Sequence, residues 1–121
     1  MKPKVVVVIG TRPEAIKMSP VFLALQEQDF FEPVLVSTGQ HREMLEQALL
    51  VFGLKPQIDL NLMTTNQTLS ELTAKIISAI TPVFEDLKPA AILVQGDTVS
   101  VLGASLDAFY LRIPIGHVEA G

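Results

Sequence analysis

The sequence predicts a doubly wound α/β fold, in which a parallel sheet is covered by helices on both faces. The first observation is that five short apolar segments rich in Val and Ile alternate with longer stretches of helical periodicity. The second is that these segments are nearly continuous apolar runs, such as "KVVVVIG", rather than alternating patterns. Strands buried on both faces have this composition, and helices between consecutive strands are typical of a parallel sheet. The predicted architecture is Rossmann-like, with the strand order 3-2-1-4-5.

Each predicted element follows from its local pattern. The expected strands are residues 4–10, 33–39, 58–62, 90–96 and 113–121, of which the third is short and weak. The expected helices are residues 13–28, 41–52, 67–87 and 98–110. The third helix is the clearest, because its apolar residues recur at three- and four-residue spacing behind Asn66 or Thr68 as the N-cap. Pro20 and Pro82 fall inside helical patterns, so we expect each of these helices to bend or break there.

Length and composition limit the classes of protein to which the chain can belong. A chain of 121 residues is the size of one domain, and 49% of its residues are hydrophobic. The apolar runs are much shorter than the roughly 20 residues of a membrane-spanning helix, and the run after Lys2 and Lys4 is too short for a secretion signal. We therefore expect a cytoplasmic protein. With no Cys and two isolated His residues, no metal site is expected, and a net charge of −4 without a basic cluster gives no support for nucleic-acid binding.

Polar residues gather where the predicted strands end. Arg12 and Lys17 follow the first strand and Asp97 follows the fourth. His117 and Glu119 lie at the end of the fifth strand, on one face by strand alternation. In a doubly wound sheet, ligands bind beyond the carboxyl ends of the strands where the strand order reverses, which here lies between the first and fourth strands. Cations at a helix start are unfavourable beside the positive end of the helix dipole, so we expect an anionic ligand to compensate.

The segment after the first strand also has a structural explanation. Thr11 and Glu14 match a capping box around Pro13, and this motif alone accounts for the residues from Gly10 to Glu14 other than Arg12. A surface Arg in a loop is commonly only a solvated charge. The capping box and an anion site therefore both remain open for this segment.

The other polar residues have structural alternatives as well. Lys17 could pair with Glu14 three residues back, Asp97 could cap the helix that follows it, and His117 could be a core histidine. Glu119 is harder to explain in this way. A carboxylate at the end of a central apolar strand is costly to bury unpaired, so it must find a cation or line a site.

Two common nucleotide-binding motifs are absent. The segment "GTRPEA" has one Gly and does not match G-x-G-x-x-G, and no G-x-x-x-x-G-K-[ST] pattern occurs, so NAD and P-loop chemistry are not expected. A receiver-type signalling domain has a similar size and order of elements. It fits poorly, because no paired acids follow the first strand and the fifth strand ends in Glu119 where a receiver carries Lys.

Five motifs together resemble the start of non-hydrolysing UDP-N-acetylglucosamine 2-epimerases. In chain order they are "GTRPEAIKMSP", "TGQHREML", "QGDT", "AFYLRIP" and "GHVEAG". The resemblance implies a GT-B architecture of two Rossmann-like domains with the active site in the cleft between them. Residues 1–121 would then be an incomplete N-terminal domain, and the second nucleotide-binding domain, with a further catalytic Glu and His, would lie beyond Gly121.

The resemblance also implies a reaction. Members of the family interconvert UDP-GlcNAc and UDP-ManNAc by inversion at C2, through elimination and re-addition of UDP, without a bound cofactor, and a homodimer is expected. Alternatives are a hydrolysing relative that releases ManNAc and UDP, or a nucleotide-sugar binding module without catalysis.

Family roles carry over only to matching positions. The resemblance implies that Arg12 and Lys17 are active-site cations and that Asp97 and Glu119 act in proton transfer and charge stabilisation. The implied substrate-binding residues are Gly10, Thr11, Arg12, Lys17, Asp97 and His117. The implied residues of a second, regulatory UDP-GlcNAc site are Gln40, His41 and Glu43.

Overall fold

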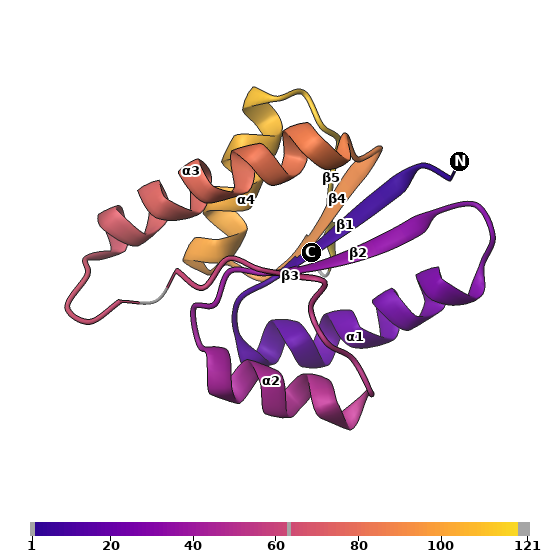
Figure 1. The fold of residues 1–121 in the computed structure, drawn as a ribbon, viewed down its shortest axis with the longest axis horizontal. Helices are drawn as coiled ribbons and strands as arrows, with labels where there is room; N and C mark the ends of the chain where they lie inside the picture. Colours follow the sequence, from indigo (N-terminus) through magenta and orange to yellow (C-terminus); the bar gives the residue numbers. More distant parts are fainter. Residues whose placement is uncertain (1, 63, 119–121) are drawn as a thin grey trace.

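In the computed structural model, which describes residues 2–62 and 64–118, strands and helices alternate along the chain. The strands are β1 (Lys4–Ile9), β2 (Glu32–Ser37), β3 (Ile58–Asp59), β4 (Ala91–Gln95) and β5 (Ile115–Val118). The helices are α1 (Arg12–Glu27), α2 (Arg42–Val51), α3 (Leu69–Leu87) and α4 (Val99–Tyr110). All neighbouring strands are parallel and their order is β3-β2-β1-β4-β5, which confirms the predicted fold and strand order (Figure 1).

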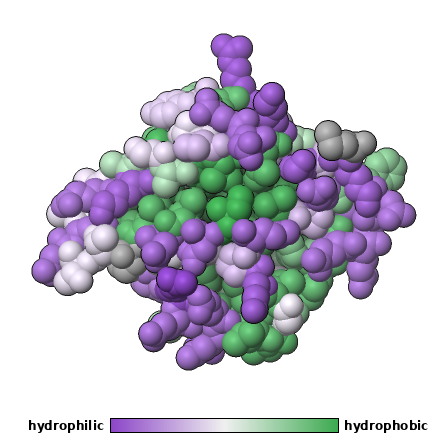
Figure 2. All heavy atoms as spheres, viewed as in Figure 1, coloured by the Kyte–Doolittle hydropathy of each residue, from purple (hydrophilic) through white to green (hydrophobic). Residues whose placement is uncertain are grey.

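Two layers of helices enclose the sheet, with α1 and α2 on one face and α3 and α4 on the other (Figure 1). Side chains of the central strand β1 alternate between the layers: Val6 and Val8 pack with α3 and α4, whereas Val7 and Ile9 pack with α1 and α2. Each such burial stabilises the fold by about 1.5–3 kcal/mol, which explains the continuous apolar run in the sequence. Figure 2 shows hydrophobic residues at the centre of one face, between the two helical layers, with hydrophilic residues around them.

Threonine residues cap three of the helices. Thr68 caps α3, because its hydroxyl accepts a hydrogen bond from Glu71 N at 3.1 Å, and this decides between the two predicted caps. The capping box predicted for Thr11 and Glu14 is present at the start of α1. Thr98 caps α4. None of the helices in the described ranges is both long and apolar enough to cross a membrane.

The helix breaks predicted at two prolines do not occur. Pro20 lies inside α1 and Pro82 inside α3, and both helices continue through them. The residues directly before the prolines, Ser19 and Thr81, each donate a hydroxyl hydrogen bond to the carbonyl four residues back, at 2.6 and 2.8 Å. Packing of both helices on the sheet outweighs the local cost of about 3 kcal/mol for an internal proline.

The third strand is shorter than predicted. The structure has a strand of two residues in place of the expected 58–62. Asn61 has a φ of +52°, a left-handed conformation through which a strand does not continue. The ends of the other elements agree with the prediction within two residues, except for the predicted end of the fifth strand, which is not tested. Residues 119–121, which belong to the predicted fifth strand, lie outside the described residues.

A buried carboxyl group lies between α3 and α4. Asp107 is 3% exposed, and the Thr81 hydroxyl lies 2.8 Å both from Asp107 Oδ1 and from Ile77 O. Thr81 has one hydroxyl proton, so it cannot donate to both of these acceptors. A protonated Asp107 removes the conflict, because it donates to Thr81 while Thr81 donates to Ile77. Asp107 Oδ2 is buried and has no partner among the described residues, which also disfavours a negative charge.

The pKa of Asp107 is raised above its ordinary value of 3.8. Burial is the largest cause; a hydrogen bond that Thr81 donates to the ionised carboxylate lowers the pKa, and the negative charge of Glu85 raises it. The folded chain therefore binds this proton more tightly than the unfolded chain. The stabilisation is fully present below pH 3.8 and is lost as the pH rises through the folded-state pKa.

We expect Asp107→Asn to stabilise the chain at neutral pH, because the amide can donate to Thr81 as the protonated acid does and carries no charge. The free energy of unfolding should exceed that of the native chain near pH 8, and the difference should shrink as the pH falls toward about 4. Urea unfolding, followed by circular dichroism at a series of pH values, measures the unfolding free energy of the variant and of the native chain. Asp86 is exposed at the end of α3, so Asp86→Asn is the control. Parallel pH profiles for Asp107→Asn and the native chain would contradict this assignment.

Candidate functional site

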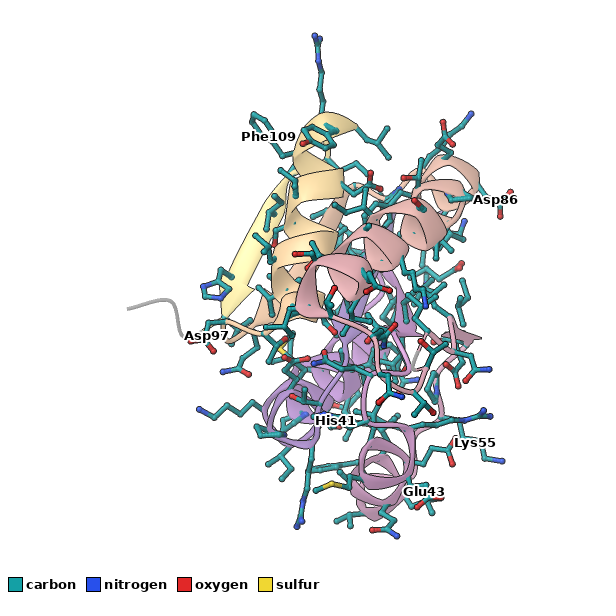
Figure 3. The ribbon with its side chains drawn as sticks, turned by 90° about the vertical axis from the view of Figure 1, so that its left-hand side faces the viewer. His41, Glu43, Lys55, Asp86, Asp97 and Phe109 are labelled. Carbon is teal, nitrogen blue, oxygen red and sulfur yellow. The ribbon has the colours of Figure 1, made fainter. Side chains whose placement is uncertain are left out.

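The sheet opens between β1 and β4 at its carboxyl edge. Among the described residues, β1 and β4 pair from Val5 with Ala91 to Val7 with Leu93. On their other sides both strands stay paired to their last residue, β1 with β2 and β4 with β5. The strands therefore diverge where the strand order reverses, and the crevice lies where the sequence predicts it. Figure 3 faces this carboxyl edge, from which the starts of α1, α2 and α4 project.

One buried carboxylate spans the crevice. Glu14 of α1 is 1% exposed, and its Oε1 accepts hydrogen bonds from Gly10 N at 2.7 Å and Thr11 N at 3.2 Å. Its other oxygen, Oε2, accepts a hydrogen bond from Thr98 Oγ1 at 2.5 Å. The capping-box residue thus also holds the loop after β4, a contact that sequence analysis missed because the two residues are distant in the chain.

A second polar contact joins the loop after β2 to α4. The hydroxyls of Thr38 and Ser100 lie 2.9 Å apart and are both buried, and Ser100 Oγ donates to Gln40 Oε1 at 2.7 Å. The backbone N–H of His41 donates to Gly10 O at 3.2 Å. The loops after β1, β2 and β4 therefore meet in one place. Nothing in the sequence distinguished Thr38 or Ser100 from ordinary loop and helix residues.

The predicted cations lie on α1, on the side of the crevice formed by β1. Arg12 is the first residue of the helix and Lys17 follows within the next two turns, and both are exposed. Arg12 lies at the positive end of the α1 helix dipole, a position that favours a nearby anion.

Asp97 lies on the opposite side of the crevice and is exposed; Figure 3 shows it at the outer end of the loop after β4. The alternative that Asp97 caps α4 is wrong, because the N-cap is Thr98, whose hydroxyl accepts a hydrogen bond from Val101 N at 3.5 Å. The Asp97 carboxylate is thus not required to begin the helix.

His117 joins the end of β5 to the same loop. Its Nε2 lies 2.7 Å from Gly96 O, and the side chain is exposed, so the alternative of a core histidine is wrong. Gly96 has a φ of +88°, which turns the backbone directly before Asp97. Glu119, the second predicted carboxylate, lies outside the described residues, so its place relative to His117 stays a prediction.

The three residues predicted for a second site lie further along the same edge. Gln40, His41 and Glu43 line a surface pocket together with Arg42, whose guanidinium bonds Glu46 at 3.2 Å. His41 and Glu43 are exposed, whereas Gln40 is half-buried by its contact with α4. Gln40 thus connects this pocket to the crevice. Within residues 2–62 and 64–118, no three His, Asp or Glu side chains come together in a way that could hold a metal ion.

Comparison with known proteins decides the family. The family model described as UDP-N-acetylglucosamine 2-epimerase matches residues 23–121. The chain belongs to this family. The UDP-N-acetylglucosamine 2-epimerase of Neisseria meningitidis serogroup A is 54% identical over 118 residues, which cover 98% of this chain and 32% of the relative. The family assigned from the five sequence motifs is therefore confirmed.

Solved structures of epimerases agree with the observed fold. The N. meningitidis UDP-GlcNAc 2-epimerase bound to UDP-GlcNAc superimposes with a TM-score of 0.93 at 54% identity, over 98% of this chain and 32% of that one. The S. aureus protein solved with UDP also has a TM-score of 0.93, at 50% identity, over 98% of this chain and 31% of that one. The chain thus spans about a third of the length of the relatives that it matches.

We expect Gly10→Ala to destabilise the chain, because an added Cβ would lie 2.0 Å from Ser100 Oγ and 2.7 Å from Thr38 Oγ1, both buried. Such overpacking costs about 1–3 kcal/mol. Gly53→Ala is the control: its Cβ meets nothing within 4 Å, but its φ of +70° strains the backbone by about 1 kcal/mol. Urea unfolding should show a larger loss of unfolding free energy for Gly10→Ala than for Gly53→Ala. An equal or smaller loss would show that the three loops do not pack as closely as described.

Proposed function

We propose that the complete polypeptide to which these residues belong interconverts UDP-GlcNAc and UDP-ManNAc by inversion at C2. Membership of the epimerase family supports this, as does the 54% identical N. meningitidis enzyme that was solved with UDP-GlcNAc bound. The observation that carries the proposal is the crevice itself. Two exposed cations, Arg12 and Lys17, lie on one side of it, and the exposed carboxylate of Asp97 lies on the other, where the strand order reverses.

The proposed chemistry uses elimination followed by re-addition. The bond between C1 and the UDP oxygen breaks with its electron pair leaving on UDP, a carboxylate removes the C2 proton, and a C1–C2 double bond forms. The intermediate is 2-acetamidoglucal. A proton is then delivered to the opposite face of C2 while the UDP oxygen bonds C1 again. No net oxidation or reduction occurs, so the reaction needs no redox cofactor.

The residues around the crevice have the charges that this reaction requires. Arg12 and Lys17 would hold the diphosphate and stabilise the departing UDP, and Gly10 and Thr11, whose N–H groups already donate to Glu14, would line the substrate site beside them. Asp97 and Glu119 would act as the acid–base pair, one removing the C2 proton and the other stabilising the cationic ring. His117, whose ring is fixed on Gly96 O, would bind the substrate next to Asp97.

The remaining assignments follow the family pattern. Gln40, His41 and Glu43 would form part of a second UDP-GlcNAc site that regulates the enzyme, since they line a pocket that adjoins the crevice through Gln40. Residues 1–121 would be one wall of a two-domain cleft, with a second nucleotide-binding domain as the other wall. The complete enzyme would act as a cytoplasmic homodimer.

We expect Asp97→Asn and Glu119→Gln in the complete polypeptide each to lower kcat at least about 100-fold with a smaller change in KM, as for the loss of a general acid or base. The measurement is conversion of UDP-GlcNAc to UDP-ManNAc, with solvent deuterium at C2 followed by proton NMR. Asp86→Asn removes a carboxylate at the opposite end of α3 and should leave kcat unchanged. Near-normal turnover in both site variants would exclude these carboxylates from the mechanism, and free UDP as the main product would indicate a hydrolysing enzyme.

We expect residues 1–121 alone to bind UDP-GlcNAc only weakly and to show no epimerisation. Arg12, Lys17 and Asp97 are exposed in this chain, where ion pairing to a diphosphate is screened by solvent, and the opposite wall that would exclude water is lacking. Calorimetry measures the binding, and proton NMR in deuterated water measures exchange at C2. Micromolar binding with measurable exchange would show that the first wall contains most of the site.

A further inference from the structure

We propose that Glu14 is a positioning residue that sets the distance between the two halves of the site. Its carboxylate joins the start of α1, which carries Arg12, to the loop that carries Asp97, through the hydrogen bond from Thr98. We call this contact the Glu14–Thr98 clamp. The inference rests on the proposed function for its catalytic consequence, whereas the clamp itself is a property of the fold.

The clamp lies where the sheet no longer holds the two strands together. Pairing between β1 and β4 ends at Val7 and Leu93 among the described residues, and both strands continue beyond these positions. The spacing of the following loops is therefore not set by backbone hydrogen bonds between β1 and β4. Glu14 and Thr98 make a direct side-chain hydrogen bond across this opening.

The hydrogen-bonding groups of the clamp match each other fully. Thr98 donates its one hydroxyl proton to Glu14 Oε2 and uses a lone pair to accept from Val101 N. Glu14 accepts from Thr98 on one oxygen and from the Gly10 and Thr11 N–H groups on the other. The Gly10 N–H, the Thr11 N–H and the Thr98 hydroxyl thus all donate to one carboxylate, which can only accept. Hydrogen bonds to a charged group are about twice as strong as hydrogen bonds between neutral groups.

The burial of Glu14 distinguishes the clamp from an ordinary capping box. Glu71 occupies the same capping-box position in α3, but its side chain is exposed. The hydrogen bond from Thr68 N to Glu71 Oε1 is also longer, at 3.4 Å. A local cap does not require a buried charge, because water can satisfy the remaining oxygen. The second oxygen of Glu14 instead bonds Thr98, which lies one residue from Asp97. The position of Asp97 is thus coupled to the start of α1.

The chain offers a matched pair of variants. Thr98→Val and Thr68→Val each remove the hydroxyl of a threonine N-cap, but only the first removes the clamp. In the complete polypeptide we expect Thr98→Val to lower kcat for epimerisation about 10- to 100-fold with KM changed less than about threefold, because small displacements of reacting groups have effects of this size. Thr98→Ser keeps the hydroxyl and should restore kcat to within about threefold of the native value. Thr68→Val should leave kcat within about twofold.

A double variant tests whether the two residues act through one contact. Glu14→Gln replaces an acceptor oxygen with an amide donor, so it cannot accept from all three groups, and Glu71→Gln is its control. If the clamp is the common cause, Glu14→Gln combined with Thr98→Val should lower kcat no more than about twofold beyond the larger single effect. Effects that multiply would show that the two residues act separately and would overturn the proposal.

Hydrogen exchange of the unliganded protein gives a result that does not depend on the reaction. Thr98→Val should raise the exchange rates of the Gly10 and Thr11 amides, across the crevice from the substitution, whereas Thr68→Val should not. Unchanged exchange at these amides, or a kcat for Thr98→Val within about twofold of Thr68→Val, would overturn the proposal. A native polypeptide without epimerase activity would refute the proposed function instead. The hydrogen-exchange result would then still show whether the Glu14–Thr98 clamp couples the two sides of the crevice.

Discussion

Strand β1 lies at the centre of the sheet, and its residues from Val5 to Ile9 are buried, so this part of the strand has no room for polar side chains. Groups that bind or transform a ligand must therefore come from the residues that follow its carboxyl end. Pairing between β1 and β4 stops before either strand ends. The candidate site is a consequence of this separation, because it leaves an opening at the edge of a rigid apolar layer.

Polar side chains maintain the opening. The buried pair of Thr38 with Ser100 and the partly buried pair of Glu14 with Thr98 connect segments that the sheet does not pair, and Gly10 is small enough to let Ser100 approach. Glu14, Thr38 and Ser100 are buried, so a hydrogen bond that one of these side chains leaves unmade is costly. Arg12 and Asp97, for which we propose chemical roles, can then stay exposed without also stabilising the fold.

Local pattern was sufficient to predict most of the fold. The Val runs of β1 and β2, the periodicity of α3 and the capping box at Thr11 depend on neighbours in the sequence, and the structure confirms them. The crevice followed from the strand order alone. The length of β3 did not, because its end is set by the left-handed conformation of Asn61, for which the surrounding pattern gave no signal.

Tertiary context decided the features that local pattern could not. Asp97 and Thr98 are both good N-caps, and only the structure shows that Thr98 takes this role. Pro20 is tolerated inside a helix because packing outweighs its local cost. Thr38 and Ser100 are unremarkable residue types in the sequence, and their contact is made across 62 positions of the chain.

The separation of 84 positions between Glu14 and Thr98 has a consequence for the order in which the protein assembles. During synthesis, β1 and α1 emerge before β4 and α4, and Glu14 can bond the amides of Gly10 and Thr11 at once because these bonds are local. Its second oxygen must remain hydrated until β4 has entered the sheet and the first turn of α4 has formed. Contacts of such long range form late, so the nascent chain can acquire its helices and most of its sheet before the two halves of the site reach their final spacing.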